Sequence, residues 1–207
     1  MPHLLELFSG TGSIGRVFEE AGWRVTKVDI RADFEPTICK SVLELEPEDI
    51  YGETVDLVWG SPPCTHYSVA RTKAKTPRDL EGSDALVAAV LKSASYYNAP
   101  YFFENPYGLL RTRHVVEGIP MHIIDYCKYN DGDLKHGGRK RTCVWTNTNW
   151  RPSRPLCKKD CRFCVNGKHV DIAQRQLHTL EELYAIPKAL PEELVEWWEN
   201  KETWDSR

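Results

Sequence analysis

Short apolar runs alternate with amphipathic segments over residues 3–105, and this alternation constrains the fold more than any other feature of the sequence. The apolar runs, which predict strands, are HLLELF, RVTKVDI, DLVWG and PYFFEN. Between them lie SIGRVFEEAG and DALVAAVLKSASYYN, whose apolar positions recur at helical spacing. Strands that alternate with helices predict an α/β fold with a Rossmann-like, doubly wound parallel sheet covered by helices on both faces.

The amino-acid composition of the chain changes near residue 150, and this change predicts three regions. Residues 1–150 form the main α/β domain, in which IPMHIIDYCKYN and RTCVWTN predict two later strands that pair as an antiparallel hairpin. Residues 151–175 are short of aliphatic side chains and rich in Cys, Pro and basic residues, which indicates a small inserted module. Residues 176–207 predict a helical segment that completes the main domain.

Composition and charge exclude some classes of protein. The net charge of −3 gives no overall attraction for a polyanion, so any nucleic-acid contact must come from a local basic surface. No apolar run is long enough to cross a bilayer, and the amino terminus lacks the pattern of a secretory signal. We therefore expect a cytoplasmic or nuclear protein that is not secreted, contacts no membrane and is a monomer by default. Seven cysteines in such a chain favour thiol chemistry or metal binding over disulfides.

The stretch LFSGTGSIG carries a glycine pattern typical of nucleotide-binding loops. Gly10, Gly12 and Gly15 follow a predicted strand and open a helix, where missing side chains let a ligand approach the backbone amides. Asp29 ends the next strand and can accept hydrogen bonds from ribose hydroxyls. The pattern predicts a nucleoside cofactor, although a simple glycine turn with a solvent-facing Asp would look the same. By itself it does not separate nicotinamide cofactors from S-adenosylmethionine.

Two strand exits carry reactive side chains that should meet at one edge of the sheet. Cys64 follows two prolines after DLVWG, and Glu104 stands at the end of PYFFEN. The carboxyl ends of parallel strands form the ligand-binding edge of open α/β sheets. A thiolate that attacks C6 of a cytosine, with a carboxylic acid at N3, makes C5 nucleophilic enough to accept a methyl group. Loss of the C5 proton then expels the sulfur.

On four motifs the sequence resembles the DNA cytosine-5 methyltransferases. The matching stretches are LLELFSGTGSIG, DLVWGSPPCTHYS, YFFENPYGLL and GGRKRTCVW, in the order of that family. The resemblance implies S-adenosylmethionine as methyl donor, DNA as partner and a base swung out of its stack. It implies Cys64 as nucleophile, Glu104 as the N3 partner, and Arg139 and Arg141 as paired arginines that hold the base or its phosphate.

The resemblance also assigns the remaining candidate contacts. Those expected at the cofactor are Phe8, Ser9, Gly10, Gly12, Asp29, Ile30 and Pro62. The loop after Cys64 is polar and basic and is expected to reach phosphates through Ser68, Arg71, Lys73, Lys75 and Arg78; a solvated basic loop is the alternative. Only residues 148–178 separate the arginine motif from the tail, where family members usually have a larger target-recognition region. We therefore expect a short or relaxed recognition sequence, because each bidentate base contact contributes only about 1–3 kcal/mol.

A cysteine cluster in the inserted module predicts a metal site. Cys157, Cys161, Cys164 and His169 offer three thiolates and an imidazole, a donor set that suits one structural, tetrahedral zinc ion. Free surface thiols in a basic loop are the alternative. Cys39, Cys127 and Cys143 lie in or beside apolar runs and are expected to be core residues.

Three other functions stay open on the sequence. An RNA cytosine-5 methyltransferase would use the same chemistry on a different polymer. A catalytically idle nucleic-acid-binding protein would not need Cys64 and Glu104 together. A methyltransferase acting on an exocyclic amino group commonly has an aromatic residue directly after the two prolines, and here that position is Cys64.

Overall fold

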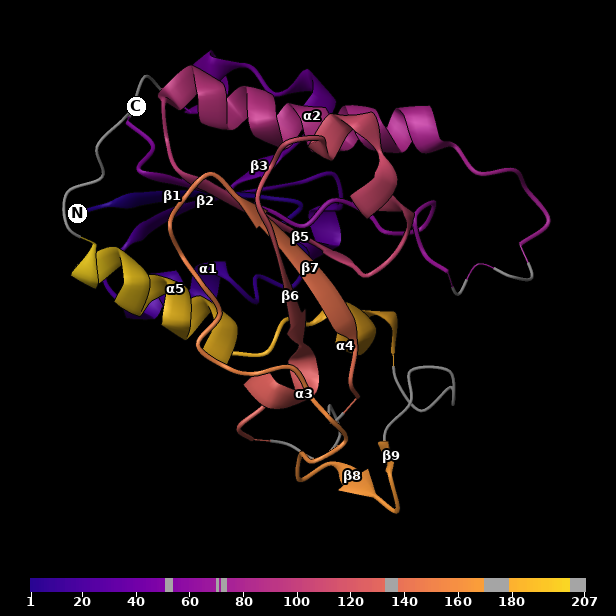
Figure 1. Cartoon of the computed structure of the whole chain (residues 1–207). Coiled ribbons are helices and arrows are strands. Elements are labelled where there is room, and N and C mark those ends of the chain that lie inside the picture. The colour runs from indigo at the N-terminus through magenta and orange to yellow at the C-terminus, as the bar shows by residue number, and fades with distance from the viewer. Residues whose placement is uncertain (51–53, 70, 72–73, 133–137, 170–178, 202–207) are drawn as a thin grey trace.

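A helix-covered sheet organises the chain in the computed structural model. The structure describes residues 1–50, 54–69, 71, 74–132, 138–169 and 179–201. One helical layer contains α2, and the opposite layer contains α1 and α5, with the sheet between them (Figure 1). The short β8–β9 hairpin projects from the end of the molecule near α3.

The strands and helices of the described residues have the following bounds. The strands are β1 (His3–Leu7), β2 (Arg24–Asp29), β3 (Ile38–Cys39), β4 (Leu57–Gly60), β5 (Tyr101–Pro106), β6 (Met121–Asp125), β7 (Arg141–Thr146), β8 (Cys164–Val165) and β9 (Lys168–His169). The helices are α1 (Gly15–Glu20), α2 (Leu80–Tyr97), α3 (Tyr126–Tyr129), α4 (Leu180–Tyr184) and α5 (Ala189–Asn200). Short 3-10 helices cover Ala32–Phe34, Val42–Glu44, Pro47–Ile50, Leu109–Thr112 and His114–Val116.

The large sheet has seven strands in the order β3-β2-β1-β4-β5-β7-β6. The first five are parallel, and β7 pairs antiparallel with both β5 and β6. This confirms the predicted doubly wound α/β fold and the predicted antiparallel hairpin. One element differs, because the apolar run expected to be a strand through residue 130 leaves the sheet at Asp125 and continues as the single turn α3.

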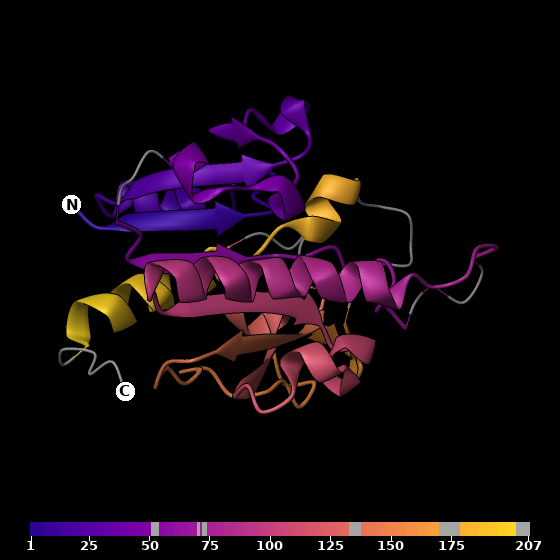
Figure 2. The ribbon, with the colours of Figure 1, turned by 90° about the horizontal axis from the view of Figure 1, so that it is seen from above.

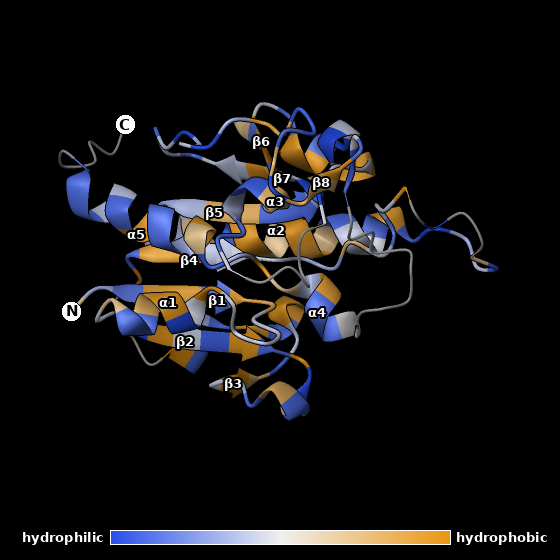
Figure 3. Ribbon diagram, turned by 90° about the horizontal axis from the view of Figure 1, so that it is seen from below, coloured by the Kyte–Doolittle hydropathy of each residue, from blue (hydrophilic) through white to orange (hydrophobic). Residues whose placement is uncertain are grey.

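Two apolar cores lie on the two faces of the sheet. On one face, α2 buries Val87 and Val90 against Val58 of β4. On the other, Phe18 of α1 and Leu194 of α5 pack with Trp59 of β4. Figure 3 shows that apolar residues are concentrated in the strands and on the helix faces turned towards them. Because both faces of the parallel strands are covered, polar chemistry is confined to the strand ends.

The carboxyl-terminal helices belong to the same framework. Trp198 of α5 meets Trp23 edge to face at 4.8 Å between ring centroids, and Trp197 meets Phe102 of β5 at 5.4 Å. The shorter α4 begins at a capping box formed by Thr179 and Glu182. Viewed from above, α4 lies beside the carboxyl ends of β1 and β2 (Figure 2). Within the described residues no helix has the length and apolar character needed to cross a membrane.

Candidate active site and metal site

A cavity of about 470 Å³ opens at the carboxyl ends of β1, β2, β4 and β5. Its lining includes most of the residues predicted from the sequence: Phe8, Ser9, Gly10, Asp29, Ile30, Pro62, Cys64 and Glu104. Glu181 and Tyr184 of α4 complete one wall. The parallel strands bring these side chains together because each strand ends at the same edge of the sheet.

The glycine-rich loop turns sharply at this edge. Gly10 and Gly12 have φ angles of +48° and +70°, in the left-handed region that favours glycine. The Asp29 carboxylate accepts hydrogen bonds from the backbone N–H groups of Gly10, at 2.8 Å, and Arg31, at 2.9 Å. Asp29 therefore holds the loop against the end of β2 while its remaining lone pairs face the cavity. Gly12, predicted as a cofactor residue, does not line the cavity and lies near the Lys27 side chain.

The cavity has the donors and surfaces that a nucleoside cofactor requires. Ile30 is 71% exposed, although isoleucine is usually buried, and it lines the cavity beside Phe34. A Cβ at Gly10 would meet no atom within 4 Å, so there is free space directly above its backbone. An apolar side chain for a base, a carboxylate at the end of β2 and an open glycine backbone fit the predicted S-adenosylmethionine.

A second loop, residues 61–68, carries the Cys64 thiol and is fixed at several points. Asn105 is almost completely buried and donates from Nδ2 to the Pro62 carbonyl oxygen at 2.8 Å. Further along, the Tyr67 carbonyl accepts from Leu109 N–H at 2.9 Å. The Tyr67 hydroxyl donates to Asp84 of α2 at 2.7 Å. These contacts tie the loop to β5, to the 109–112 helix and to α2, so the thiol has a defined position.

Cys64 and Glu104 face the same cavity, and the charge of Glu104 affects the pKa of the Cys64 thiol. Burial raises the pKa of the Cys64 thiol, the charge of Glu104 raises it further, and the charge of Lys140 opposes both. Burial also raises the pKa of the Glu104 carboxyl, again with Lys140 in opposition. Glu104 Oε2 is buried without a hydrogen-bond partner among the described residues. Such a carboxyl favours its protonated form and can donate a hydrogen bond to a ring nitrogen in the cavity.

The predicted arginine pair is placed elsewhere. Arg139 and Arg141 both donate to the carboxylate of Asp125, with the shortest contacts at 3.2 and 2.9 Å, and neither lines the cavity. The residue between them, Lys140, does line it. Lys140 precedes β7 and has a φ of +25°, so it does not follow the alternation of an extended strand. Sequence reasoning missed Lys140, because no periodic pattern marks a residue in this conformation. The contact of the arginines with base or phosphate stays a prediction.

In the basic loop after Cys64, two predicted phosphate contacts, Arg71 and Arg78, donate hydrogen bonds to carbonyl groups of the same loop. Arg78 donates to the carbonyl groups of His66 and Ser68. Arg71 donates to the carbonyl groups of Thr76 and Pro77 at 3.0 and 3.1 Å. Lys75 is exposed. Another residue predicted to reach a phosphate, Lys73, lies outside the described residues. The predicted phosphate contacts stay predictions.

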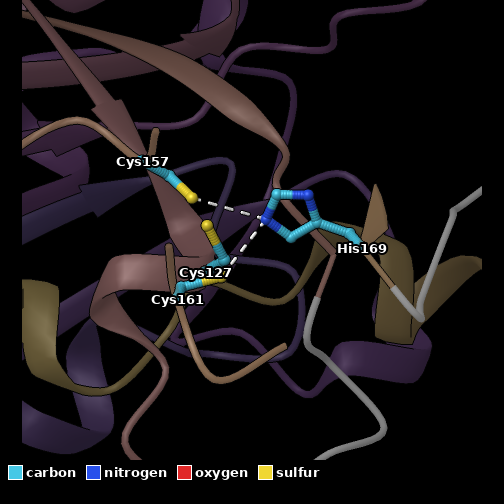
Figure 4. A group of neighbouring side chains, drawn as sticks. All are labelled: Cys127, Cys157, Cys161 and His169. Atoms are coloured by element: carbon cyan, nitrogen blue, oxygen red, sulfur yellow. Dashed lines mark hydrogen bonds between the residues drawn. The ribbon is translucent and has the colours of Figure 1, made fainter. Parts of the chain in front are cut away.

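A group of thiols and an imidazole gathers where the β8–β9 hairpin meets α3. The ligand atoms of Cys127, Cys157, Cys161 and His169 all lie within 4.8 Å of one another (Figure 4). The fourth predicted ligand, Cys164, is also adjacent, with Sγ at 3.4 Å from His169 Nε2. This group could hold a metal ion. Cys127, which the sequence had indicated as a core residue, is buried but belongs to this group.

Local turn chemistry forms the hairpin that carries two of these donors. Asn166 and Gly167 connect β8 to β9 with φ angles of +51° and +73°. Two positive φ angles in a two-residue loop are typical of an Asn-Gly hairpin turn, and the pairing places Cys164 opposite His169. The Asn-Gly dipeptide was the sequence signal that could have predicted this arrangement.

The other cysteines divide between core and surface. All seven cysteines are free thiols. Cys143 is fully buried in β7, which confirms its predicted place in the core. The same prediction was wrong for Cys39, which is exposed because it ends the edge strand β3.

No family model matches the chain. A protein of Frog virus 3 (isolate Goorha) named "Probable DNA (cytosine-5)-methyltransferase" is 32% identical over 190 residues, which cover 86% of this chain and 84% of that protein. The chain belongs to the DNA (cytosine-5)-methyltransferase family. It therefore belongs to a family of enzymes that methylate cytosine at C5.

Solved structures support the fold of this methyltransferase. The crystal structure of a prophage-encoded protein from E. coli, described as a DNA modification methyltransferase, is 16% identical with a TM-score of 0.50 over 70% of this chain and 46% of that one. The Entamoeba histolytica methyltransferase EhMeth is 17% identical with a TM-score of 0.50, over 70% of this chain and 52% of that one. This methyltransferase thus matches about half the length of each of these two structures.

Proposed function

We propose that this methyltransferase transfers a methyl group from S-adenosylmethionine to C5 of cytosine in DNA through a covalent adduct on Cys64. The observation that carries the proposal is the shared cavity, in which the Cys64 thiol and the buried Glu104 carboxyl lie beside the glycine-rich loop. A thiol and an acid that face one ring-sized space are the two groups that activation of a pyrimidine requires.

The reaction proceeds by addition, transfer and elimination. The Cys64 thiolate forms a bond to C6 while Glu104 donates a hydrogen bond or a proton to N3, and the ring electron pair moves to C5. C5 is then the atom that would accept the methyl group supplied by bound S-adenosylmethionine. The C5 proton leaves to solvent, the S–C6 bond breaks with its electron pair returning to Cys64 as a thiolate, and a proton given to N3 returns to Glu104. The raised pKa of Glu104 favours the protonated form that the first step needs.

Residues of β1, β2 and their loops would hold the cofactor. Asp29 is placed to accept from ribose hydroxyls, and Ile30 and Phe8 would contact the adenine ring. Pro62 would lie beside the methyl donor, close to the thiol that it precedes by two positions. The cofactor supplies the methyl group, and the chain supplies its orientation towards Cys64.

A substrate that cannot complete the reaction tests this proposal. In an oligonucleotide with 5-fluorocytosine, C5 carries no removable proton, so the protein should remain attached when S-adenosylmethionine is present. The Cys64→Ala variant should form no adduct, while Cys39→Ala, which removes an exposed thiol, should form it at the normal rate. Absence of an adduct with the unmodified protein contradicts the proposal. A DNA arm and an RNA arm identify the polymer, and a faster RNA arm would replace DNA as the substrate.

We also propose that the thiol and imidazole group binds one structural zinc ion. Zinc–sulfur bonds of about 2.3 Å and zinc–nitrogen bonds of about 2.0–2.1 Å place two ligands of a tetrahedral site about 3.6–3.8 Å apart. The His169 Nε2 atom lies 3.6 Å from Cys157 Sγ, 3.3 Å from Cys161 Sγ and 3.4 Å from Cys164 Sγ. Atomic absorption should find one zinc per chain, and a value near zero in protein prepared without chelators rejects the proposal.

The small recognition region supports a short target. Few side chains between β7 and α4 remain to contact base edges, so the chain should demand at most about four defined bases. Methylation mapped on random-sequence DNA measures this directly. A strict requirement for a longer site would contradict it.

A further inference from the structure

One carboxylate connects the metal site to the catalytic cavity. Asp125 is 1% exposed and ends β6. Its two oxygens accept from Arg139, from Arg141 and from the backbone N–H of Cys157, the last at 2.9 Å. A metal-ligand candidate and both arginines thus share one buried acceptor.

Metal donors lie on both sides of this carboxylate. Cys127 follows Asp125 by two residues in α3, and Cys157 donates its N–H to the carboxylate. Arg139 also donates to the Cys157 carbonyl at 3.2 Å. Cys127 comes from the main α/β domain, whereas Cys157, Cys161 and His169 come from the inserted module. A metal bound by these four residues would join the two regions at Asp125.

The contacts that begin at Asp125 reach the cavity through Lys140. Lys140 has a φ of +25°, which is rare for a residue with a side chain. The Lys140 Nζ donates to the Leu183 carbonyl of α4 at 2.9 Å and lines the cavity that holds Cys64 and Glu104. The arginines on both sides of it are anchored on Asp125. Their anchorage keeps the Lys140 backbone in this conformation and its charge beside the thiol.

We propose that a metal held by Cys127, Cys157, Cys161 and His169 positions Lys140 in the catalytic cavity, with Asp125 and its two arginines as the connection. Asp125 is a positioning residue, because it is not among the described residues that line the cavity. The inference rests on the proposed zinc ion. It replaces Cys164 of the ligand set predicted from the sequence by Cys127. It also gives the inserted module a role in the catalytic site.

The ligand set is tested first, with no DNA or cofactor present. Cys127→Ser should lower the zinc content from one per chain to near zero, and Cys39→Ser, which removes an exposed thiol outside the group, should leave it at one. Full zinc in Cys127→Ser overturns the ligand assignment. Because this measurement needs no methyl transfer, its failure is distinct from failure of the proposed methylation of cytosine.

The connection is tested by the reactivity of Cys64. The charged or titratable groups that face it are Glu104, Lys140, Tyr126 and Tyr184. Alkylation of Cys64, followed by peptide mass spectrometry over a range of pH, reports its thiolate fraction. Lys140→Gln should move this profile to higher pH, and a shift of one pH unit slows alkylation at pH 7.5 about tenfold.

Asp125→Asn separates positioning from folding. The variant keeps the shape of the side chain and all four metal donors, so zinc should remain at one per chain. Its Cys64 profile should nevertheless shift in the same direction as that of Lys140→Gln. Retained zinc with an unshifted profile would show that the arginine anchorage does not position Lys140, and would overturn the proposal.

Discussion

The catalytic cavity and the Cys-rich module are organised by opposite means. In the cavity, the functional side chains lie at the carboxyl ends of strands whose backbone pairing is continuous, as Asp29 ends β2 and Glu104 lies within β5. In the module, β8 and β9 have two residues each, and the buried cluster beneath them consists of Cys127, Cys157 and Phe163, with Cys161 packed against it. The sheet brings the residues of the cavity together. In the module, the metal ligands themselves must order the short segments around them.

Metal removal is the strongest test of this difference between the cavity and the Cys-rich module. Structural zinc contributes about 10–16 kcal/mol of apparent binding free energy, far more than so small an apolar cluster. Chelation should therefore remove hydrogen-exchange protection from β8 and β9 and leave β1, β4 and β5 protected. Unchanged hydrogen-exchange protection of β8 and β9 after chelation would show that the module stays folded without metal.

On the catalytic side, the largest effect should come from the acid. Glu104→Gln keeps the shape of the side chain but cannot transfer a proton, so methyl transfer should fall by about 10²–10⁴-fold. The thermal midpoint should be unchanged or higher, because a buried carboxyl whose Oε2 atom has no hydrogen-bond partner among the described residues is removed. Glu199→Gln, an exposed carboxyl on α5, is the control. A large drop in thermal midpoint would mean that Glu104 supports the sheet.

A second buried carboxyl predicts a dependence of stability on pH. Burial raises the pKa of Glu6 from 4.5 to about 7, against opposing hydrogen bonds from the backbone N–H groups of Gly15 and Ile14. Because the folded-state pKa is raised, the contribution is present below pH 4.5 and is lost as pH rises through 7, in total about 3 kcal/mol.

Urea unfolding at several pH values measures this slope. Glu6→Gln should remove it, whereas Glu199→Gln should retain it. If the stability of Glu6→Gln still falls between pH 4.5 and 7, other groups cause the slope.

The smallest expected effect concerns the loop that carries the thiol. Asn105→Ala leaves the buried Pro62 carbonyl without its donor, which should cost about 1–3 kcal/mol of unfolding free energy. A matched control is Asn200→Ala, since Asn200 also donates to a backbone carbonyl but is exposed. Chemical denaturation of both variants measures the difference. Equal losses would show that the sheet alone holds the loop.

Local sequence patterns predicted most of the side chains that the structure brings together in the cavity. The strands were recognisable from their apolar runs, and parallel strands necessarily bring their exits to one edge, so Cys64 and Glu104 could be paired without a structure. The helix α2 begins at Leu80, four residues earlier than its apolar pattern, because the Asp79 side chain caps it by accepting from Gly82 N–H. Such helix boundaries depend on a single polar contact and are harder to recognise in the sequence than the apolar periodicity of the helix.

The sequence by itself determined the doubly wound sheet, the glycine-rich loop and the thiol and carboxyl at its edge, because periodicity and strand direction are local properties of the chain. Only the tertiary structure decided that Cys127 joins the thiol group, that Arg139 and Arg141 lie on Asp125, and that Lys140 enters the cavity. The hydrogen bonds of these residues join positions as far apart as 14 residues, for Arg139 and Asp125, and 43 residues, for Lys140 and Leu183. Their partners are selected by packing and by the burial of charge, and no periodic pattern in the sequence records that selection.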